Sequence, residues 1–182
     1  KLIASYTTQN SRLSSDIVLC MTEFKQKIWM GTDGGGINIL DPTTGNITVL
    51  EHISGDNHSL PTNTILCLHS DSAGNIWAGS KREGVINIRE VSMRTYTNVV
   101  LGHNKGLSQS TVLQLYQEPA SEELWIAMDG GGINKFIPST ETFVHYPDTW
   151  GDKMVSITGF TPNELLVSAF SKGIFIFDKK TG

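Results

Sequence analysis

The sequence predicts an all-β fold assembled from four copies of one four-stranded antiparallel unit. Trp29, Trp77 and Trp125 stand 48 residues apart (77 − 29 and 125 − 77), and each opens a segment that reads like the other two. A fourth copy follows with Leu166 at the tryptophan position, 41 residues further on (166 − 125). A period of roughly 40 to 50 residues is typical of propeller blades, so the repeat determines the expected fold class.

Each repeat has the signature of four short strands. In the second copy the apolar residues alternate with period two, and glycine-containing turns separate strands that we expect at 64–70, 75–79, 85–89 and 94–98. No stretch has a helical period with caps. Four strands joined by hairpins make a blade, and adjacent blades bury each other's apolar faces.

The repeats divide 1–182, taken as a single β-propeller segment, into one leading strand and four blades. Residues 1–8 are expected to be the outer strand of a preceding or closing blade. The blades are expected at 13–53, 60–99, 107–147 and 153–182, the last of them without its outer strand. Two arrangements remain open: the leading strand completes the last blade and closes a four-bladed ring, or the chain is an arc of a larger propeller.

Composition limits the classes of partner. The chain has 38% apolar and 18% charged residues, 18 glycines and a formal net charge of −4, and its charges do not cluster. It is not basic enough to follow a phosphate backbone, so no nucleic acid is expected. It has no signal peptide and no apolar run approaching the roughly 18 residues of a membrane span, so we expect no membrane contact by this segment.

The two cysteines are expected to be small buried hydrophobes. Aligned on the tryptophans, Cys67 falls on the Leu19 position and Cys20 on the Leu68 position. Strand alternation would then point the two thiols to opposite faces, which makes a disulfide improbable. Neither a metal nor a redox pair is expected, and no cofactor is predicted.

Several segments together resemble the two-component regulator propeller repeat. They are 60–68, 74–79, the run 28–38 and the turn 41–45 that follows it. The resemblance spans essentially the whole chain. The second repeat departs from the family's Asp-Gly-Gly hairpin with Lys81, Arg82 and Glu83, and the fourth lacks the tryptophan.

The resemblance implies a sensor. In that family the repeat builds the periplasmic region of inner-membrane hybrid two-component systems, similar to two tandem seven-bladed propellers followed by an immunoglobulin-like domain, a membrane helix, a histidine kinase and a response regulator. It implies recognition of an oligosaccharide, with no chemistry in this part of the protein. The implied partners are the other blades of the same parent protein and a further copy, through self-association of the segment or a homodimer of the parent.

The residues that recur in each repeat are expected to have structural roles. The three tryptophans occupy one position of the second strand, where an indole fills the gap between neighbouring blades. The runs at 33–36 and 129–132 have neither the strand-to-helix context of a phosphate loop nor the spacing of a calcium loop. They are therefore expected to be hairpin turns that need positive φ.

Ligand contacts are expected where the repeats differ. The loop between the second and third strands of a blade emerges on the same face as the link to the next blade. The variable links on this face are 53–59, 100–106 and 147–153, and its hairpins present Asp33, Lys81, Arg82, Asp129, Ser171 and Lys172.

Trp150 is the one tryptophan outside the repeat, and it offers a platform for the apolar C–H face of a sugar. Arg82, Asp129 and His103 would supply hydrogen bonds to hydroxyl groups, and Asp33 and Lys81 lie on the same face. The structural alternative for Trp150 is a loop anchor against the blade edge. His58 and His103 lack a third ligand at metal spacing, so no metal is predicted.

Two other function classes remain open. A propeller hydrolase or lyase would need converging carboxylates or a histidine with an acidic partner, whereas the acidic residues here are scattered over turns. A protein-interaction propeller would bind a partner protein with the same face. The sequence alone does not distinguish this function from that of a sugar sensor.

Overall fold

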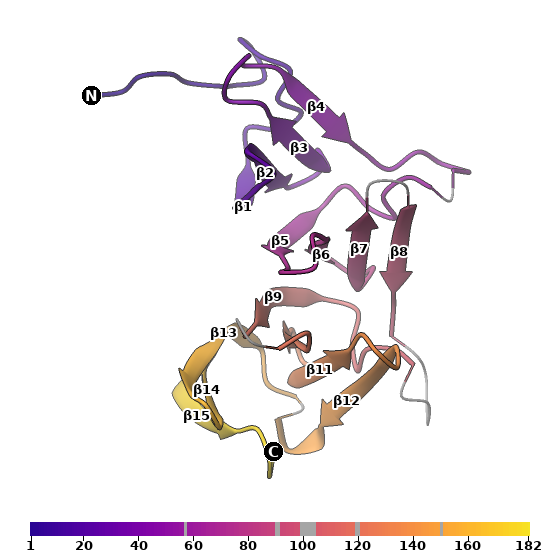
Figure 1. The fold of residues 1–182 in the computed structure, drawn as a ribbon, viewed down its shortest axis with the longest axis vertical. Helices are drawn as coiled ribbons and strands as arrows, with labels where there is room; N and C mark the ends of the chain where they lie inside the picture. The colour runs from indigo at the N-terminus through magenta and orange to yellow at the C-terminus, as the bar shows by residue number, and fades with distance from the viewer. Residues whose placement is uncertain (57, 90–91, 99–104, 119–120, 150) are drawn as a thin grey trace.

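The computed structural model describes residues 1–56, 58–89, 92–98, 105–118, 121–149 and 151–182, and these form four antiparallel sheets that follow one another along an arc (Figure 1). The first strands of neighbouring sheets contact one another, β1 with β5, β5 with β9 and β9 with β13. The all-β propeller prediction is confirmed. The helical part of the described chain is a single 3-10 turn, η1 (Pro147–Thr149).

Each sheet is a meander in which consecutive strands pair. The first two blades contain β1 (Val18–Phe24), β2 (Lys27–Thr32), β3 (Ile37–Leu40), β4 (Ile47–Leu50), then β5 (Ile65–Ser70), β6 (Ile76–Ser80), β7 (Val85–Arg89) and β8 (Ser92–Tyr96). The last two contain β9 (Val112–Gln117), β10 (Leu124–Met128), β11 (Ile133–Ile137), β12 (Thr142–Tyr146), then β13 (Met154–Thr161), β14 (Glu164–Ala169) and β15 (Gly173–Asp178). The fourth strand of the second blade begins two residues earlier than expected because Arg89 pairs directly with Ser92.

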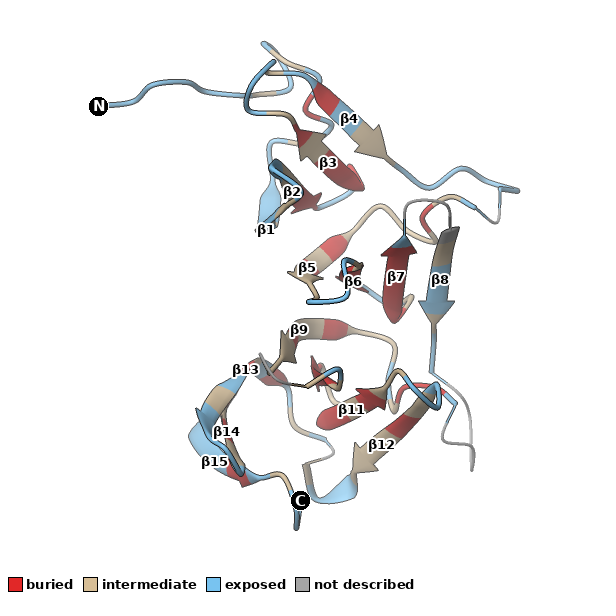
Figure 2. Cartoon of the chain, viewed as in Figure 1, coloured by how far each residue is buried: buried red, intermediate tan, exposed pale blue. Residues whose placement is uncertain are grey.

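The ends of the arc are the exposed part of the fold. Strands β6 and β10 are buried along their whole length, whereas β1 and β15 are mostly exposed (Figure 2). Ile174 and Ile176 of β15 are 69% and 59% exposed, and Met21 of β1 is 67% exposed. An inner blade is covered on both faces by its neighbours, so these outward faces are the surfaces that a further blade or another copy would cover.

Residues 1–7 form no strand. The segment leads away from the sheets (Figure 1), and Leu2 and Ile3 are 82% and 95% exposed. The strand expected at 1–8 therefore does not form here, because extended backbone gains ladder hydrogen bonds only beside a sheet edge. The sheet of β13, β14 and β15 keeps three strands, and the four blades form an open arc in this structure.

The hairpin between the second and third strands has the same shape in all four blades. Gly34 and Gly130 have φ of +82° and +79°, and the equivalent Arg82 and Ser171 adopt +82° and +62° although they carry a Cβ. This confirms the turn interpretation of the glycine runs. The departure at Arg82 changes the side chain and leaves the backbone conformation as it is in the other blades.

A buried Asn–Ser pair ties the link to the third strand in two of the blades. Asn38 Oδ1 accepts the Ser14 amide at 3.0 Å, and Asn134 Oδ1 accepts the Ser108 amide at 2.9 Å. In each pair the asparagine Nδ2 donates to the serine hydroxyl, at 2.6 and 2.7 Å. These bonds fix the link that carries the chain onto the hairpin face. The same two positions of the second blade hold Pro61 and Ile86.

The cysteine alignment was wrong by one residue. Cys20 pairs with Gly31 and Cys67 with Gly79, so the two thiols occupy equivalent positions rather than opposite faces. Cys67 lies ten residues before Trp77 (77 − 67) and Cys20 nine residues before Trp29 (29 − 20), so one extra residue in the second blade shifts the first strand against the tryptophan. Both thiols are free.

No helix in the part of the chain that the structure describes is long and apolar enough to cross a membrane.

Candidate ligand surface

The face that carries the hairpins is held to the links between blades by backbone hydrogen bonds. Gly36 donates to the carbonyl of Asn63 at 2.8 Å, and Gly84 donates to that of Ser110 at 2.9 Å. The hairpin and the link therefore lie side by side, as the strand topology predicts. We call this side of the molecule the hairpin face.

The predicted site residues lie on this face but on different blades. Asp33, Lys81 and Arg82 are exposed, and the Thr64 hydroxyl donates to Asp33 Oδ1 at 3.0 Å. Asp129 forms an ion pair with Lys153 at 3.1 Å. No described contact joins the hairpins of the second and third blades to each other. Trp150 and His103 lie outside the described residues, so their proposed contacts stay predictions.

A cluster on the hairpin face of the last two blades brings together residues that the sequence did not single out as a group. Phe170 is 67% exposed, and Lys153 Nζ lies 5.8 Å from the centroid of its ring. Lys153 also pairs with Asp129, and Lys172 pairs with Asp152. We call these five residues the Phe170 cluster. They combine an exposed aromatic ring with two carboxylates and two ammonium groups.

Sequence reasoning missed Phe170 because it belongs to the repeat that lacks the tryptophan. Asp129 and Lys172 were expected on this face as hairpin residues, and Asp152 and Lys153 lie within the variable link 147–153. The signal was present in the fourth hairpin: Phe170 occupies the position that Asp33, Lys81 and Asp129 hold in the first three blades.

The interfaces between blades are filled by aromatic residues, with one exception. Trp77 and Tyr96 pack on Phe136 with ring centroids 5.4 and 4.8 Å apart, between the second and third blades. Trp125 and Tyr146 pack on Phe177 in the same way, at 6.0 and 4.9 Å. The predicted packing role is therefore confirmed for these two tryptophans.

The exception is the interface between the first and second blades. A cavity of about 520 Å³ lies there beside Trp29, which is only partly buried, whereas Trp77 and Trp125 are 4% and 2% exposed. Its walls include Phe24, Ile39, Leu50, Ile88 and Met93. The volume is within the range of about 300 to 1,000 Å³ that small-molecule sites occupy.

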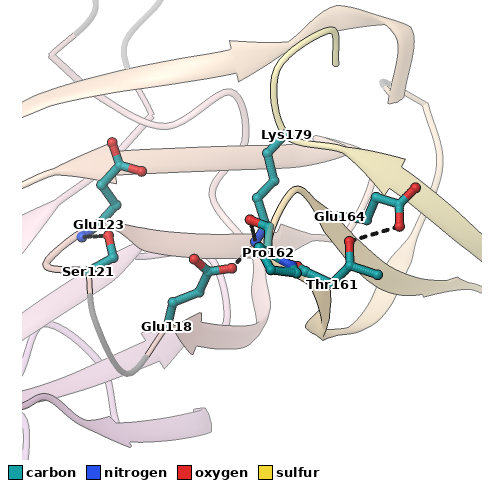
Figure 3. A network of polar contacts seen from close by, with 7 residues as sticks. All are labelled: Glu118, Ser121, Glu123, Thr161, Pro162, Glu164 and Lys179. Carbon is teal, nitrogen blue, oxygen red and sulfur yellow. Dashed lines mark hydrogen bonds and ion pairs between the residues drawn. The ribbon is translucent and has the colours of Figure 1, made fainter.

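Polar groups also join the blades on the side opposite the hairpins. The ammonium group of Lys179 pairs with Glu118 across the interface of the last two blades and donates to the carbonyl of Pro162 at 3.0 Å (Figure 3). The lysine side chain is 13% exposed and the glutamate 28%. The ammonium group also donates to the carbonyl of Thr161 at 3.3 Å, so its three N–H groups all have partners, which favours a structural contact over a ligand site.

Burial shifts the pKa of three groups in the described first strands. Burial raises the pKa of the Cys20 thiol to about 11 and raises the pKa of Cys67 further, while burial lowers the pKa of His69. These three residues lie in first strands, within the stack of blades. Among the described residues no group of three His, Cys, Asp or Glu side chains is placed to hold a metal ion.

Comparison with known proteins agrees with the repeat. Residues 59–82 match the family model described as two component regulator propeller. This segment is similar to a two component regulator propeller repeat. It covers the link, β5 and β6, and it ends at the Lys81–Arg82 turn. No curated protein matches the chain.

Solved structures share the fold. The extracellular domain of BT3049, assigned as a hybrid two component system of B. thetaiotaomicron, superposes with a TM-score of 0.84 at 20% identity, over 98% of this chain and 25% of that chain. The computationally designed Ika8 and Ika4 proteins superpose with a TM-score of 0.62 at 15% identity, over 91% and 88% of this chain and 46% and 90% of theirs. The chain thus spans a quarter of the length of the first of these structures, and at these identities the likeness shows the propeller fold alone.

Proposed function

We propose that this chain is part of the extracytoplasmic, periplasmic ligand-sensing propeller of a hybrid two-component system, which recognises an oligosaccharide and passes the signal to a histidine kinase elsewhere in the full protein. The two component regulator propeller repeat at 59–82 supports the sensor class. The fold likeness to a sensor's extracellular domain along 98% of the chain supports it further.

The Phe170 cluster is the observation that supports an oligosaccharide as the ligand. A sugar ring presents apolar C–H groups beside hydroxyls, so it stacks on an exposed aromatic face and bonds to charged groups at its edge. Phe170 offers such a face, and the Asp129–Lys153 and Lys172–Asp152 pairs border it. Because each pair contains both a donor and an acceptor group, a sugar hydroxyl can either donate a hydrogen bond to a carboxylate or accept one from an ammonium group.

Arg82 gives independent support for contacts on the hairpin face. Its φ of +82° is a left-handed conformation that costs a residue with a Cβ roughly 1 to 2 kcal/mol, and the first and third blades use glycine there. A strained residue that keeps its side chain is a reason to expect a function for that side chain. A guanidinium at this turn would donate hydrogen bonds to sugar hydroxyls or to a uronate carboxylate.

A glycan array on the intact protein tests the proposal, followed by calorimetry of the best ligand. Phe170→Ala is expected to weaken binding by roughly 1 to 3 kcal/mol, and Arg82→Ala is expected to weaken it as well. Phe160→Ala is the matched control, because Phe160 is 56% exposed but lies beside the β13–β14 turn, away from the hairpin face.

The other function classes give different results in the same experiment. A hydrolase would release reducing ends from the array sugars, and a protein-interaction propeller would bind none of them. An intact protein that binds no glycan, or one in which Phe170→Ala and Phe160→Ala behave alike, would remove the support for an oligosaccharide site at the cluster.

A further inference from the structure

The cavity between the first and second blades has a cause in the sequence. Leu50 occupies the strand-four position that Tyr96 and Tyr146 hold in the next two blades, each facing the first residue of the third strand. Ile88 occupies the position of Phe136 and Phe177. Two aromatic rings are thus replaced by smaller aliphatic side chains at the same interface.

The ring of Phe24 packs edge-on against Trp29 at 6.0 Å but leaves the space open. The other two interfaces close around their tryptophans, whereas Trp29 keeps part of its indole accessible and the space beside it amounts to about 520 Å³. Protein interiors are normally packed to the density of organic crystals. A space of this size, lined by the rings of Trp29 and Phe24 and by several aliphatic chains, therefore has the form of a pocket for a flat apolar group.

Three basic side chains line the cavity, those of Lys25, Lys27 and Arg89. Lys27 lines the cavity and, two residues before Trp29 in β2, projects from the same face of the strand. His58 lines it from the link between the blades. No carboxylate side chain belongs to the described part of the lining. Asp41, whose pKa is lowered mainly by the amides of Thr43 and Thr44 and only in part by Lys27, is held within its own turn.

We propose that this inter-blade cavity binds a small planar aromatic carboxylate, with its ring on Trp29 between Leu50 and Ile88 and its carboxylate at Lys27. The site is separate from the Phe170 cluster and goes beyond the oligosaccharide-binding function proposed above. A ligand here contacts two blades at once, so its binding would also stabilise their interface.

A binding assay with 2-naphthoate and its neutral analogue 2-naphthylmethanol tests both halves of the proposal. Both are titrated into the protein by calorimetry, and 2-naphthoate is expected to bind more tightly than the alcohol. Lys27→Gln is expected to weaken naphthoate binding by roughly two- to fivefold and to leave binding of the alcohol unchanged. Lys180→Gln, an exposed lysine in the turn after β15, is the matched charge control and should change neither.

Filling the cavity tests its location. The double variant Leu50→Tyr, Ile88→Phe introduces at this interface the rings that close the other two, and it should lower naphthoate affinity at least tenfold. Near-ultraviolet circular dichroism checks that this variant is folded, and Ile88→Phe alone serves if the pair is not. Ile176→Thr, on the exposed face of β15, controls for adsorption to the arc end and should bind as the parent does.

Three results would overturn the proposal. The first is equal affinity for 2-naphthoate and the alcohol, and the second is a folded filled variant that still binds normally. The third is loss of binding in Ile176→Thr, which would place the probe on the end of the arc rather than between the blades. Because none of these measurements involves a sugar, failure here leaves the oligosaccharide proposal standing.

Discussion

The three tryptophans share a repeat position but differ in burial, so truncating them should have unequal costs. Trp77 is 4% exposed, packs on Tyr96 and Phe136, and donates a hydrogen bond from Nε1 to Asp71 at 2.8 Å. Its replacement by alanine removes a buried indole and leaves a cavity that a rigid sheet interface closes only in part. We expect the free energy of unfolding to fall by about 3 to 5 kcal/mol.

Replacing Trp29 by alanine should lower the free energy of unfolding far less. It is partly buried, its only aromatic partner in the described chain is Phe24 at 6.0 Å, and it already borders an open space. Truncation there enlarges an existing cavity and removes fewer contacts, so we expect a loss of about 1 to 2 kcal/mol. Trp125, 2% exposed and packed on Tyr146 and Phe177, should behave as Trp77 does.

Equilibrium unfolding in urea, followed by far-ultraviolet circular dichroism, measures the three variants under one set of conditions. The expected order of destabilisation places Trp77→Ala and Trp125→Ala together and Trp29→Ala well below them. Equal losses at all three positions would refute the reasoning. They would show that the first interface is packed as tightly as the others and would also remove the basis for the inter-blade pocket.

Four further predictions concern single features. Arg82→Gly should raise the free energy of unfolding by about 1 kcal/mol in a urea titration, because glycine adopts positive φ without strain; no gain would show that Arg82 is not strained. Burial raises the pKa of Cys20 to about 11 and raises that of Cys67 further, against about 8.5 for a thiol in the unfolded chain. The free energy of unfolding should therefore be highest below about pH 8.5 and should fall as the pH rises toward 11. A urea midpoint that does not change from pH 8 to pH 10 would contradict this. Lys179→Met should lower the free energy of unfolding by roughly 1 to 3 kcal/mol, because Glu118 loses its partner in a partly buried site; an unchanged thermal midpoint would count against the structural contact. The exposed apolar faces at both arc ends predict association of two or more copies in light scattering of this segment, and a stable monomer would contradict that.

The repeat made the fold predictable, whereas the ends and the site depended on features that no single repeat reveals. A 48-residue interval (77 − 29) placed the tryptophans on equivalent strands, and period-two alternation located the strand bounds of the second blade within two residues. One extra residue in the second blade was enough to misalign Cys20 and Cys67. Residues 1–8 read as a strand, but a strand needs a neighbouring edge, and sequence pattern does not supply one.

The candidate site was predicted only in outline for a related reason. The hairpin face follows from strand order, so Asp129 and Lys172 were placed correctly on it. Their grouping around Phe170 depends on how the third blade meets the fourth, which is a property of packing between repeats. The pocket beside Trp29 was not predicted at all, because it arises from two small residues on different blades that come together only in the folded arc.

Differences between repeats therefore fall into two kinds, and only one of them points to function. The Ser14–Asn38 and Ser108–Asn134 pairs are replaced in the second blade by Pro61 and Ile86, so that both polar partners are lost together. Such a paired replacement maintains the architecture. Leu50 and Ile88 also change together, but both become smaller, and the space that they leave is not filled. An uncompensated difference of this kind is where a blade interface becomes available to a ligand.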